Sequence, residues 1–284
     1  MQAETPAARR WWRGGRALLV LLLAAAGLRA ALVLGGGQSF FPDEIRFARS
    51  IILLLRLQAG RLDDALEFGL APDHTAWVWV GAGPALVQAA WLAVRGLPLE
   101  STTWWAHTAW ISALVLSLAS TAVVGLVHAV ARRAGAPRDE ALLAALLAAC
   151  ATSLLYFSRH LLPYDAALAL GLAALWVGLT PAPRLATSAA CGLLAGATFL
   201  TYNAYWLLAA GVLVAAAVRA GGRPGLVAVL GLGAAAPPAL VVALDLALRG
   251  GGLLSESRSF AASARQGAFE EGWRLPWEYL WEAE

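Results

Sequence analysis

The chain has no lysine, few charged residues and only two cysteines. All 21 basic residues are arginine, which excludes both lysine Schiff-base chemistry and the lysine of a P-loop. Charged residues make up 14% of the sequence, against about 25% in ordinary soluble domains, so a soluble globular protein is not expected. The net charge of +3 is small and the arginines are scattered, a pattern that does not indicate nucleic-acid binding. Cys150 and Cys191 both fall in apolar stretches, which predicts two small buried side chains rather than a disulfide or a metal pair.

What the chain does have is apolar runs, since 60% of its residues are hydrophobic. A helix needs about 20 apolar residues to cross the hydrocarbon core of a bilayer. Glycine and proline mark the breaks between most runs, although Pro237 and Pro238 fall inside the last one and are expected to kink it. The candidate spans are 17–34, 76–95, 104–131, 141–158, 165–180, 186–202, 204–219 and 225–248.

The run 76–95 decides the topology. If it spans, the later short-loop arginines lie opposite the arginine-rich N-terminus, against the positive-inside rule. The stretch from Gly81 to Pro84 also interrupts the run, and its tryptophans suit the headgroup layer. We therefore expect a broken helix that lies along, or dips into, the outer interface. The arginines that favour this arrangement are Arg132, Arg133, Arg138, Arg184, Arg219 and Arg223.

These features predict an all-α, polytopic membrane protein with about seven transmembrane helices, and with interfacial helices in the first exterior loop. Residues 1–16 would form a cytoplasmic tail, and 249–284 an exterior segment. The membrane domain would cover 17–248 and include an exterior loop at 35–103. The first run exceeds a signal-peptide core and has no clear cleavage site, so it should be retained. The expected location is the inner (plasma) membrane, with a cytoplasmic N-terminus.

Polar residues stand out at two places. Asp43 and Glu44 follow Pro42 in the first exterior loop, with Arg46 two residues on. Carboxylates near a bilayer are costly and persist mostly where chemistry or ion handling needs them. The simpler alternative is a solvated loop with a helix N-cap. Arg29, near the outer end of the first span, should snorkel to the interface, or else contact a phosphate beside Asp43.

The second polar run is Ser158-Arg159-His160-Leu161-Leu162-Pro163-Tyr164-Asp165, between two candidate spans. In the predicted topology it shares a membrane face with Asp43. The alternative is again a short interfacial turn that ends in a helix N-cap.

Both runs resemble the GT-C integral-membrane glycosyltransferases. The first is similar to the Asp-Glu-x-Arg-Tyr of members that use polyprenyl-phosphate sugars, with Phe47 in the tyrosine's place. The second resembles a Ser-Arg-x-x-x-x-Asp stretch of bacterial members related to protein O-mannosyltransferases and lipid A aminoarabinose transferases. The resemblance implies that Asp43 is the catalytic carboxylate and that Asp165 lies near the catalytic loop.

Two shorter matches are less complete. His74 sits where relatives carry His-Pro-Pro-Leu, but both prolines are missing. Thr201-Tyr202-Asn203 resembles a Thr-Lys-Tyr-Asn run, but the lysine that relatives often use near the lipid phosphate is absent. Relatives also continue with further spans, so a C-terminally truncated form is one expectation.

The resemblance implies a hexosyl- or pentosyltransferase of the cell envelope. It would move a sugar from a polyprenyl-phosphate donor to a lipid, glycan or protein acceptor at the exterior face. One carboxylate can act as general base, and arginine can bind the leaving phosphate in a bidentate way. Asp43 is assigned as the base and Glu44 as an orienting catalytic residue. The residues assigned to the donor phosphate and substrate are Arg46, Arg159, His160, Asp165, His74 and Tyr202.

Several alternatives stay open. Histidines at such places are more often interfacial polar residues than ligands. No metal ligand is assigned, and a divalent cation is left open as a cofactor. A transporter would need charged or broken spans near the midplane and paired repeats; only Pro237, Pro238 and Asp245 hint at this, and Asp245 could instead pair with Arg249 one turn on. A truncated, non-catalytic scaffold of the same fold is the third reading.

Overall fold

The structure, a computed structural model, describes residues 6–38, 44, 47–70, 75–98 and 102–252, and every regular element in these ranges is a helix. The all-α prediction is confirmed for this part of the chain. The elements in order are α1 (Pro6–Leu34), α2 (Ala48–Gln58), α3 (Leu62–Gly69), α4 (Thr75–Val94), α5 (Thr102–Arg133), α6 (Arg138–Cys150), α7 (Thr152–Phe157), α8 (Tyr164–Gly178), α9 (Leu185–Thr201), the 3-10 helix η2 (Asn203–Tyr205), α10 (Trp206–Arg219) and α11 (Pro224–Arg249).

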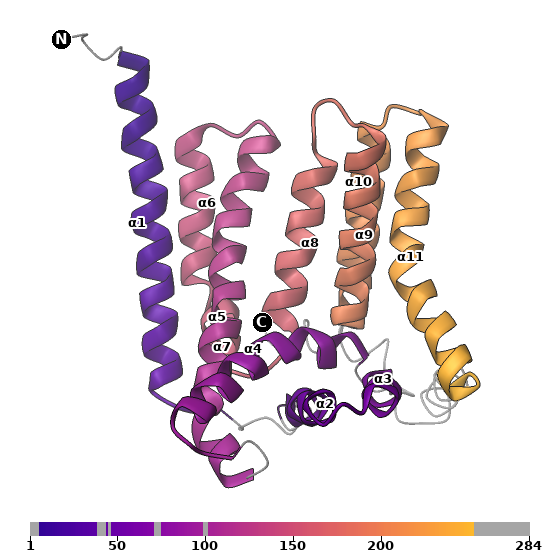
Figure 1. Cartoon of the computed structure of the whole chain (residues 1–284). Helices are drawn as coiled ribbons and strands as arrows, with labels where there is room; N and C mark the ends of the chain where they lie inside the picture. Colours follow the sequence, from indigo (N-terminus) through magenta and orange to yellow (C-terminus); the bar gives the residue numbers. More distant parts are fainter. Residues whose placement is uncertain (1–5, 39–43, 45–46, 71–74, 99–101, 253–284) are drawn as a thin grey trace, which may run out of the picture.

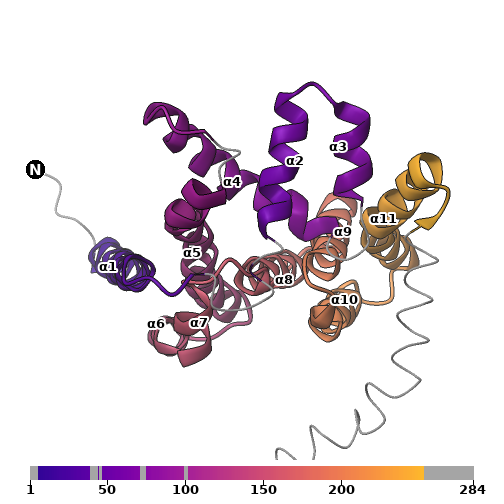
Figure 2. The same ribbon diagram turned by 90° about the horizontal axis from the view of Figure 1, so that it is seen from below.

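The helices form an upright layer with a crosswise group at one end. Helices α1, α5, α6, α8, α9, α10 and α11 stand roughly side by side, and α2, α3 and α4 lie across their lower ends (Figure 1). Seen from below, the upright helices appear end-on while α2 and α3 lie flat (Figure 2). Among the described residues, three helices are long and apolar enough to cross a membrane: Gly15–Leu34, His107–Arg133 and Pro224–Arg249. The chain is thus a helical membrane protein.

Helix ends follow the local sequence at the upper side of the layer. Helix α5 ends with Arg132 and Arg133, and α6 begins with Asp139 and Glu140 in its first turn. Each charge opposes the partial charge of its helix end, which is favourable. Gly135 makes the turn between them with a φ of 101°, a conformation that glycine adopts without strain.

Helices α9 and α11 pack closely because glycines line their contact. A Cβ on Gly192 would collide with the carbonyl of Leu230, and one on Gly196 with the carbonyl of Ala234. A Cβ on Gly233 would lie 2.8 Å from the carbonyl of Ala189. Small residues allow such close backbone approach between membrane helices. Gly192 and Gly196 of α9 therefore determine how closely α11 packs on α9.

Helix α4 agrees with the expected crosswise placement but not with the expected break. It lies across the ends of the upright helices rather than among them, as expected for the run 76–95 (Figure 1). It is continuous, however, with Pro84 inside it, so the predicted break is wrong. Gly81 lets α4 approach Ser50 of α2, and Ser112 of α5 donates to the Pro84 carbonyl at 3.1 Å. These contacts hold the helix together where local sequence favoured a break.

The predicted span 141–158 is also corrected. It divides at Ala151, whose extended backbone (φ −60°, ψ 120°) separates α6 from the short α7. Leu154 of α7 is buried, and its carbonyl accepts a hydrogen bond of 3.3 Å from Ser120 of α5. The packing of α7 on α5 therefore accounts for the break at Ala151, which the continuous apolar sequence did not indicate. Cys150, at the end of α6, is exposed, so only Cys191 is buried as predicted.

Helix α11 shows the effect of its two prolines. It stays helical through Pro237 and Pro238, and it changes direction about halfway along its length (Figure 1). Near its end, Arg249 lies 3.4 Å from the buried Asp245, which confirms the expected pair. Arg249 also donates to the Leu70 carbonyl at 3.0 Å, which ties α11 to the end of α3.

Candidate functional site

The lower end of the upright layer brings together residues from the two polar runs. Glu44 is buried, and it contacts the turn that joins α7 to α8. Its Oε1 accepts the backbone N–H of Leu161 at 2.8 Å, and its Oε2 lies 3.2 Å from Nδ1 of His160. Both side chains of the Glu44–His160 pair are fully buried. The contact spans 116 residues of sequence, so it joins the first loop to the second polar run.

Apolar packing explains why Glu44 is held there. Phe47, three residues on, is fully buried and shares one core cluster with Leu161. The same cluster contains Val33 at the end of α1 and Ile51 of α2. The phenylalanine that replaces the tyrosine of the resembled motif thus anchors the loop end. Burying its apolar ring contributes roughly 1.5–3 kcal/mol.

The hydrogen bonds of His160 define its protonation state. Arg159 donates from Nε to Nε2 of His160 at 3.3 Å. A ring nitrogen that accepts a hydrogen bond carries no proton, so the proton of the neutral ring is on Nδ1 and is donated to Glu44. Burial lowers the pKa of His160, and the nearby Arg159 lowers it further, while Glu44 opposes both. The neutral ring is therefore the favoured form.

The guanidinium of Arg159 is held on three sides. Besides the bond to His160, it lies over the ring of Tyr156 at 5.3 Å from the centroid. Gly37 backs it closely, since a Cβ there would lie 3.4 Å from Cζ of Arg159. Within the described residues, neither Nη atom of Arg159 has a hydrogen-bond partner. Two N–H groups on each Nη therefore remain for an anion.

Asp165 lies in a second buried cluster with Arg29. Arg29 is fully buried and donates from Nε to the hydroxyl of Ser120 at 2.8 Å, and from Nη1 to the Ala25 carbonyl at 3.2 Å. Asp165 lies near both residues, and its carboxylate interacts electrostatically with Arg29. The expected interfacial anchor is therefore wrong for Arg29, while a phosphate contact beside Asp43 stays a prediction because Asp43 lies outside the described residues.

This second cluster is not fully satisfied. Nη2 of Arg29 and Oδ2 of Asp165 are buried and have no hydrogen-bond partner in the part of the chain that the structure covers. The sequence did hold a signal for the cluster, because an arginine inside a span usually faces the bundle interior. Ser120, a polar residue in the middle of the long apolar α5, is the partner that sequence reasoning missed.

Tyr202 reaches the same region through aromatic stacking. Its ring centroid lies 4.7 Å from that of Tyr164 in the first turn of α8, and 5.4 Å from that of Tyr205. Tyr164 in turn lies 4.9 Å from Phe157 of α7. The α9–α10 turn is thereby joined to the turn that carries Arg159, as the predicted site requires.

Three predicted residues, Asp43, Arg46 and His74, lie outside the described residues. The expected convergence of Asp43, Arg46 and Asp165 therefore stays a prediction. The described ranges contain no group of three or more His, Cys, Asp or Glu side chains placed to hold a metal ion. Asp165 has a guanidinium as its neighbour, which is a poor setting for a cation.

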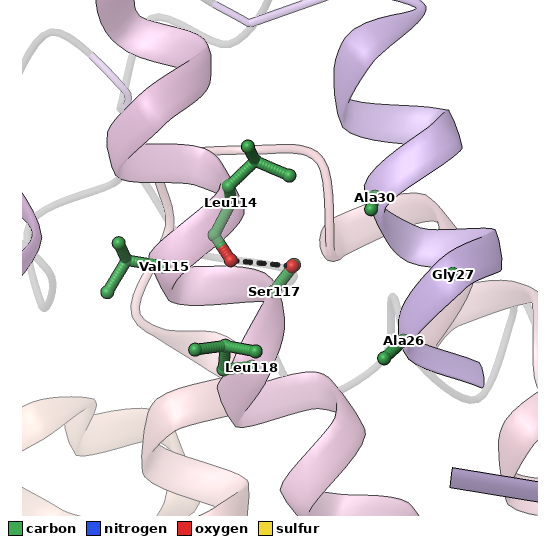
Figure 3. A pocket seen from close by; sticks show the side chains of 7 residues that line it. All are labelled: Ala26, Gly27, Ala30, Leu114, Val115, Ser117 and Leu118. Carbon is green, nitrogen blue, oxygen red and sulfur yellow. Dashed lines mark hydrogen bonds between the residues drawn. The ribbon is translucent and has the colours of Figure 1, made fainter. Parts of the chain in front are cut away.

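A groove of about 420 Å³ lies elsewhere, between α1 and α5. Figure 3 shows Ala26, Gly27 and Ala30 of α1 across from α5, whose Ser117 points toward them. Its polar side chain, Ser117, is bonded to the Leu114 carbonyl of its own helix at 2.7 Å. None of the predicted site residues lines the groove, and its apolar wall offers no group for catalysis.

Comparisons of the chain with protein-family models, with curated proteins and with solved structures find no match.

Proposed function

We propose that the chain is a GT-C-like membrane glycosyltransferase that moves a sugar from a polyprenyl-phosphate donor to an acceptor at the exterior face. The observation that carries the proposal is the buried contact of Glu44 with His160 and Leu161. The two runs that resemble the family are far apart in sequence, and this contact joins them at one end of the bundle. A shared catalytic face requires such a junction.

The proposed chemistry is a single displacement. Asp43 takes the proton of the acceptor hydroxyl as its oxygen attacks the anomeric carbon. The bond from that carbon to the phosphate oxygen breaks, and the polyprenyl phosphate leaves with the electron pair. Arg159 and Arg46 bind the phosphate as its charge grows. One displacement inverts the anomeric configuration.

The other residues have supporting roles. Both oxygens of Glu44 are bonded to the 160–161 turn, which supports the orienting role and not that of the base. Tyr202 and the Arg29–Ser120–Asp165 cluster lie near the same end and would line the substrate side. His74 keeps its proposed place in the first exterior loop.

The proposed topology has about seven spans, namely α1, α5, α6 with α7, α8, α9, α10 and α11. Helices α2, α3 and α4 would lie at the outer interface, and the N-terminus would be cytoplasmic. A cysteine placed at Ala136, in the α5–α6 turn, after replacement of Cys150 and Cys191, should resist labelling from outside intact cells. Clear labelling would reverse this topology.

The function is tested with purified full chain in lipid nanodiscs and a panel of radiolabelled polyprenyl-phosphate sugars. The expected result is consumption of one donor, release of polyprenyl phosphate and a transferred sugar of inverted configuration. Consumption with retained configuration would contradict the single displacement. Donor binding without turnover on any acceptor would favour the scaffold, and movement of a solute across sealed vesicles would favour the transporter.

A further inference from the structure

The position of Arg159 depends on a chain of hydrogen bonds that begins at Glu44. Glu44 accepts at Oε2 from Nδ1 of His160, at 3.2 Å, and His160 accepts at Nε2 from Nε of Arg159, at 3.3 Å. Glu44 and His160 are fully buried, whereas Arg159 is half-buried. The chain therefore runs from the interior toward the surface and ends at a guanidinium.

Only one state of His160 completes this chain. If the ring proton were on Nε2, that N–H would face the Nε–H of Arg159, and two donors would oppose each other. A doubly protonated ring would create the same clash and add a charge repulsion with Arg159. Glu44 prevents the wrong tautomer because a carboxylate only accepts, so it needs a donor at Nδ1.

We infer that Glu44 and His160 are positioning residues that fix Arg159 as a two-pronged anion site for the donor phosphate. The inference rests on the proposed function for the identity of the anion. Nε is bonded to His160, and the Tyr156 ring and Gly37 lie close to the guanidinium, so its position is restricted while neither Nη group has a hydrogen-bond partner among the described residues. Two parallel N–H groups match two oxygens of one phosphate.

The inference predicts a pH dependence opposite in sign to simple charge attraction. A polyprenyl-phosphate sugar is a phosphodiester, so its charge does not change near neutral pH. Protonating His160 adds a positive charge near the phosphate, which by electrostatics alone strengthens binding. In the positioning account it breaks the bond to Arg159 and weakens binding. Among the described residues, the charged groups that face His160 are Glu44 and Arg159, and the ring centroid of Tyr156 lies 5.1 Å from that of His160.

The first measurement reads the tautomer without any ligand. Nitrogen-15 NMR of histidine-labelled full chain, with the signal of His160 assigned by its loss in His160→Gln, should show a neutral ring protonated at Nδ1. A ring protonated at Nε2 would overturn the positioning role. This result does not depend on any activity of the protein.

The second measurement is binding of a radiolabelled methyl prenyl phosphodiester to the full chain in nanodiscs. His160→Phe, which removes both hydrogen bonds, should weaken binding about ten- to a hundred-fold. His160→Gln, whose side chain can accept from Arg159 and donate to Glu44, should stay close to wild type. Arg159→Gln gives the level of phosphodiester binding without the guanidinium. His128→Phe, a histidine substitution near the other end of α5, is the matched control.

The outcomes separate the two proposals. No binding by the wild type overturns the proposed donor class, and with it the role of the anion site. Wild-type binding that His160→Phe retains overturns the positioning role alone, as does wild-type binding that grows stronger below the ordinary histidine pKa of about 6.5. If His160→Phe does not fold, the tautomer and the direction of the pH effect decide.

Discussion

Two buried polar clusters in the described part of the chain differ in how completely their hydrogen bonds are made. In the Glu44–His160 cluster, both carboxylate oxygens contact donors of the 160–161 turn. In the Arg29–Asp165 cluster, one nitrogen and one oxygen are buried without a partner among the described residues. A buried polar atom without a partner costs about 1–3 kcal/mol. Both oxygens of Glu44 thus have hydrogen-bond partners in the first cluster. In the second cluster, Arg29 and Asp165 can each still hydrogen-bond to another group.

The difference bears on the roles of the two carboxylates, Glu44 and Asp165. Glu44 is held in one geometry by its partners, which suits a residue that orients others. Asp165 lies near Ser120 and Arg29, and its Oδ2 has no hydrogen-bond partner among the described residues. A water molecule or a substrate hydroxyl that both donates and accepts would satisfy Asp165 and Arg29 together. Asp165 is therefore the better candidate for a residue that responds to substrate.

The largest effect on stability is expected from breaking the second cluster. Arg29→Met leaves the buried Asp165 carboxylate without its nearby positive charge, and an uncompensated buried charge costs about 3–5 kcal/mol. The measurement is the free energy of unfolding in mixed detergent micelles. The double variant Arg29→Met/Asp165→Leu should recover most of the loss, because it removes both charges. A single variant as stable as wild type would show that the two charges are not coupled.

A smaller loss is expected at the first cluster. Glu44→Ala leaves the Leu161 N–H and the Nδ1–H of His160 buried without an acceptor, at a cost of about 1–3 kcal/mol. The same unfolding measurement applies. Glu67→Ala, an exposed glutamate on α3, should change stability by less than about 0.5 kcal/mol. If both substitutions change the free energy of unfolding equally, the hydrogen bonds of Glu44 do not contribute to stability.

The smallest effect is a pH dependence from His160. Its pKa is lower in the folded protein than in the unfolded chain, where it is about 6.5. The unfolded chain therefore binds the extra proton first, and stability falls as the pH drops below that value. His160→Gln should flatten this part of the profile of unfolding free energy against pH. Glu44, Arg159 and the other titrating groups are unchanged in that variant, so a profile identical to wild type would contradict the neutral buried ring.

Much of the fold could be predicted from composition and periodicity. The apolar runs at 17–34, 104–131 and 225–248 lie within α1, α5 and α11, because long apolar helices are encoded locally. The errors occurred where tertiary contacts override local preference. Pro84 sits inside a continuous α4 supported by Ser112, and Ala151 breaks a run that has no glycine or proline there.

The sequence indicated several residues of the candidate site but not the contacts between them. Glu44, Arg159 and His160 stand out because polar residues beside apolar spans are costly. Nothing in the spacing indicates that Glu44 bonds to His160, since that pairing depends on how the first loop packs on the α7–α8 turn. Arg29 shows the same limit: its place inside a span suggests that it faces the bundle interior, but its partner Ser120 on α5 is seen only in the structure.

The most direct test of the central claim is the rate of sugar transfer by Asp43→Asn compared with wild type, in purified full chain with the donor that the wild type consumes. Removing a general base should reduce the rate by about 10²–10⁴ while donor binding and unfolding free energy stay near wild type. Asp63→Asn, on the exposed face of α3, is the matched control and should keep the wild-type rate. Full transferase activity in Asp43→Asn would contradict the proposed mechanism.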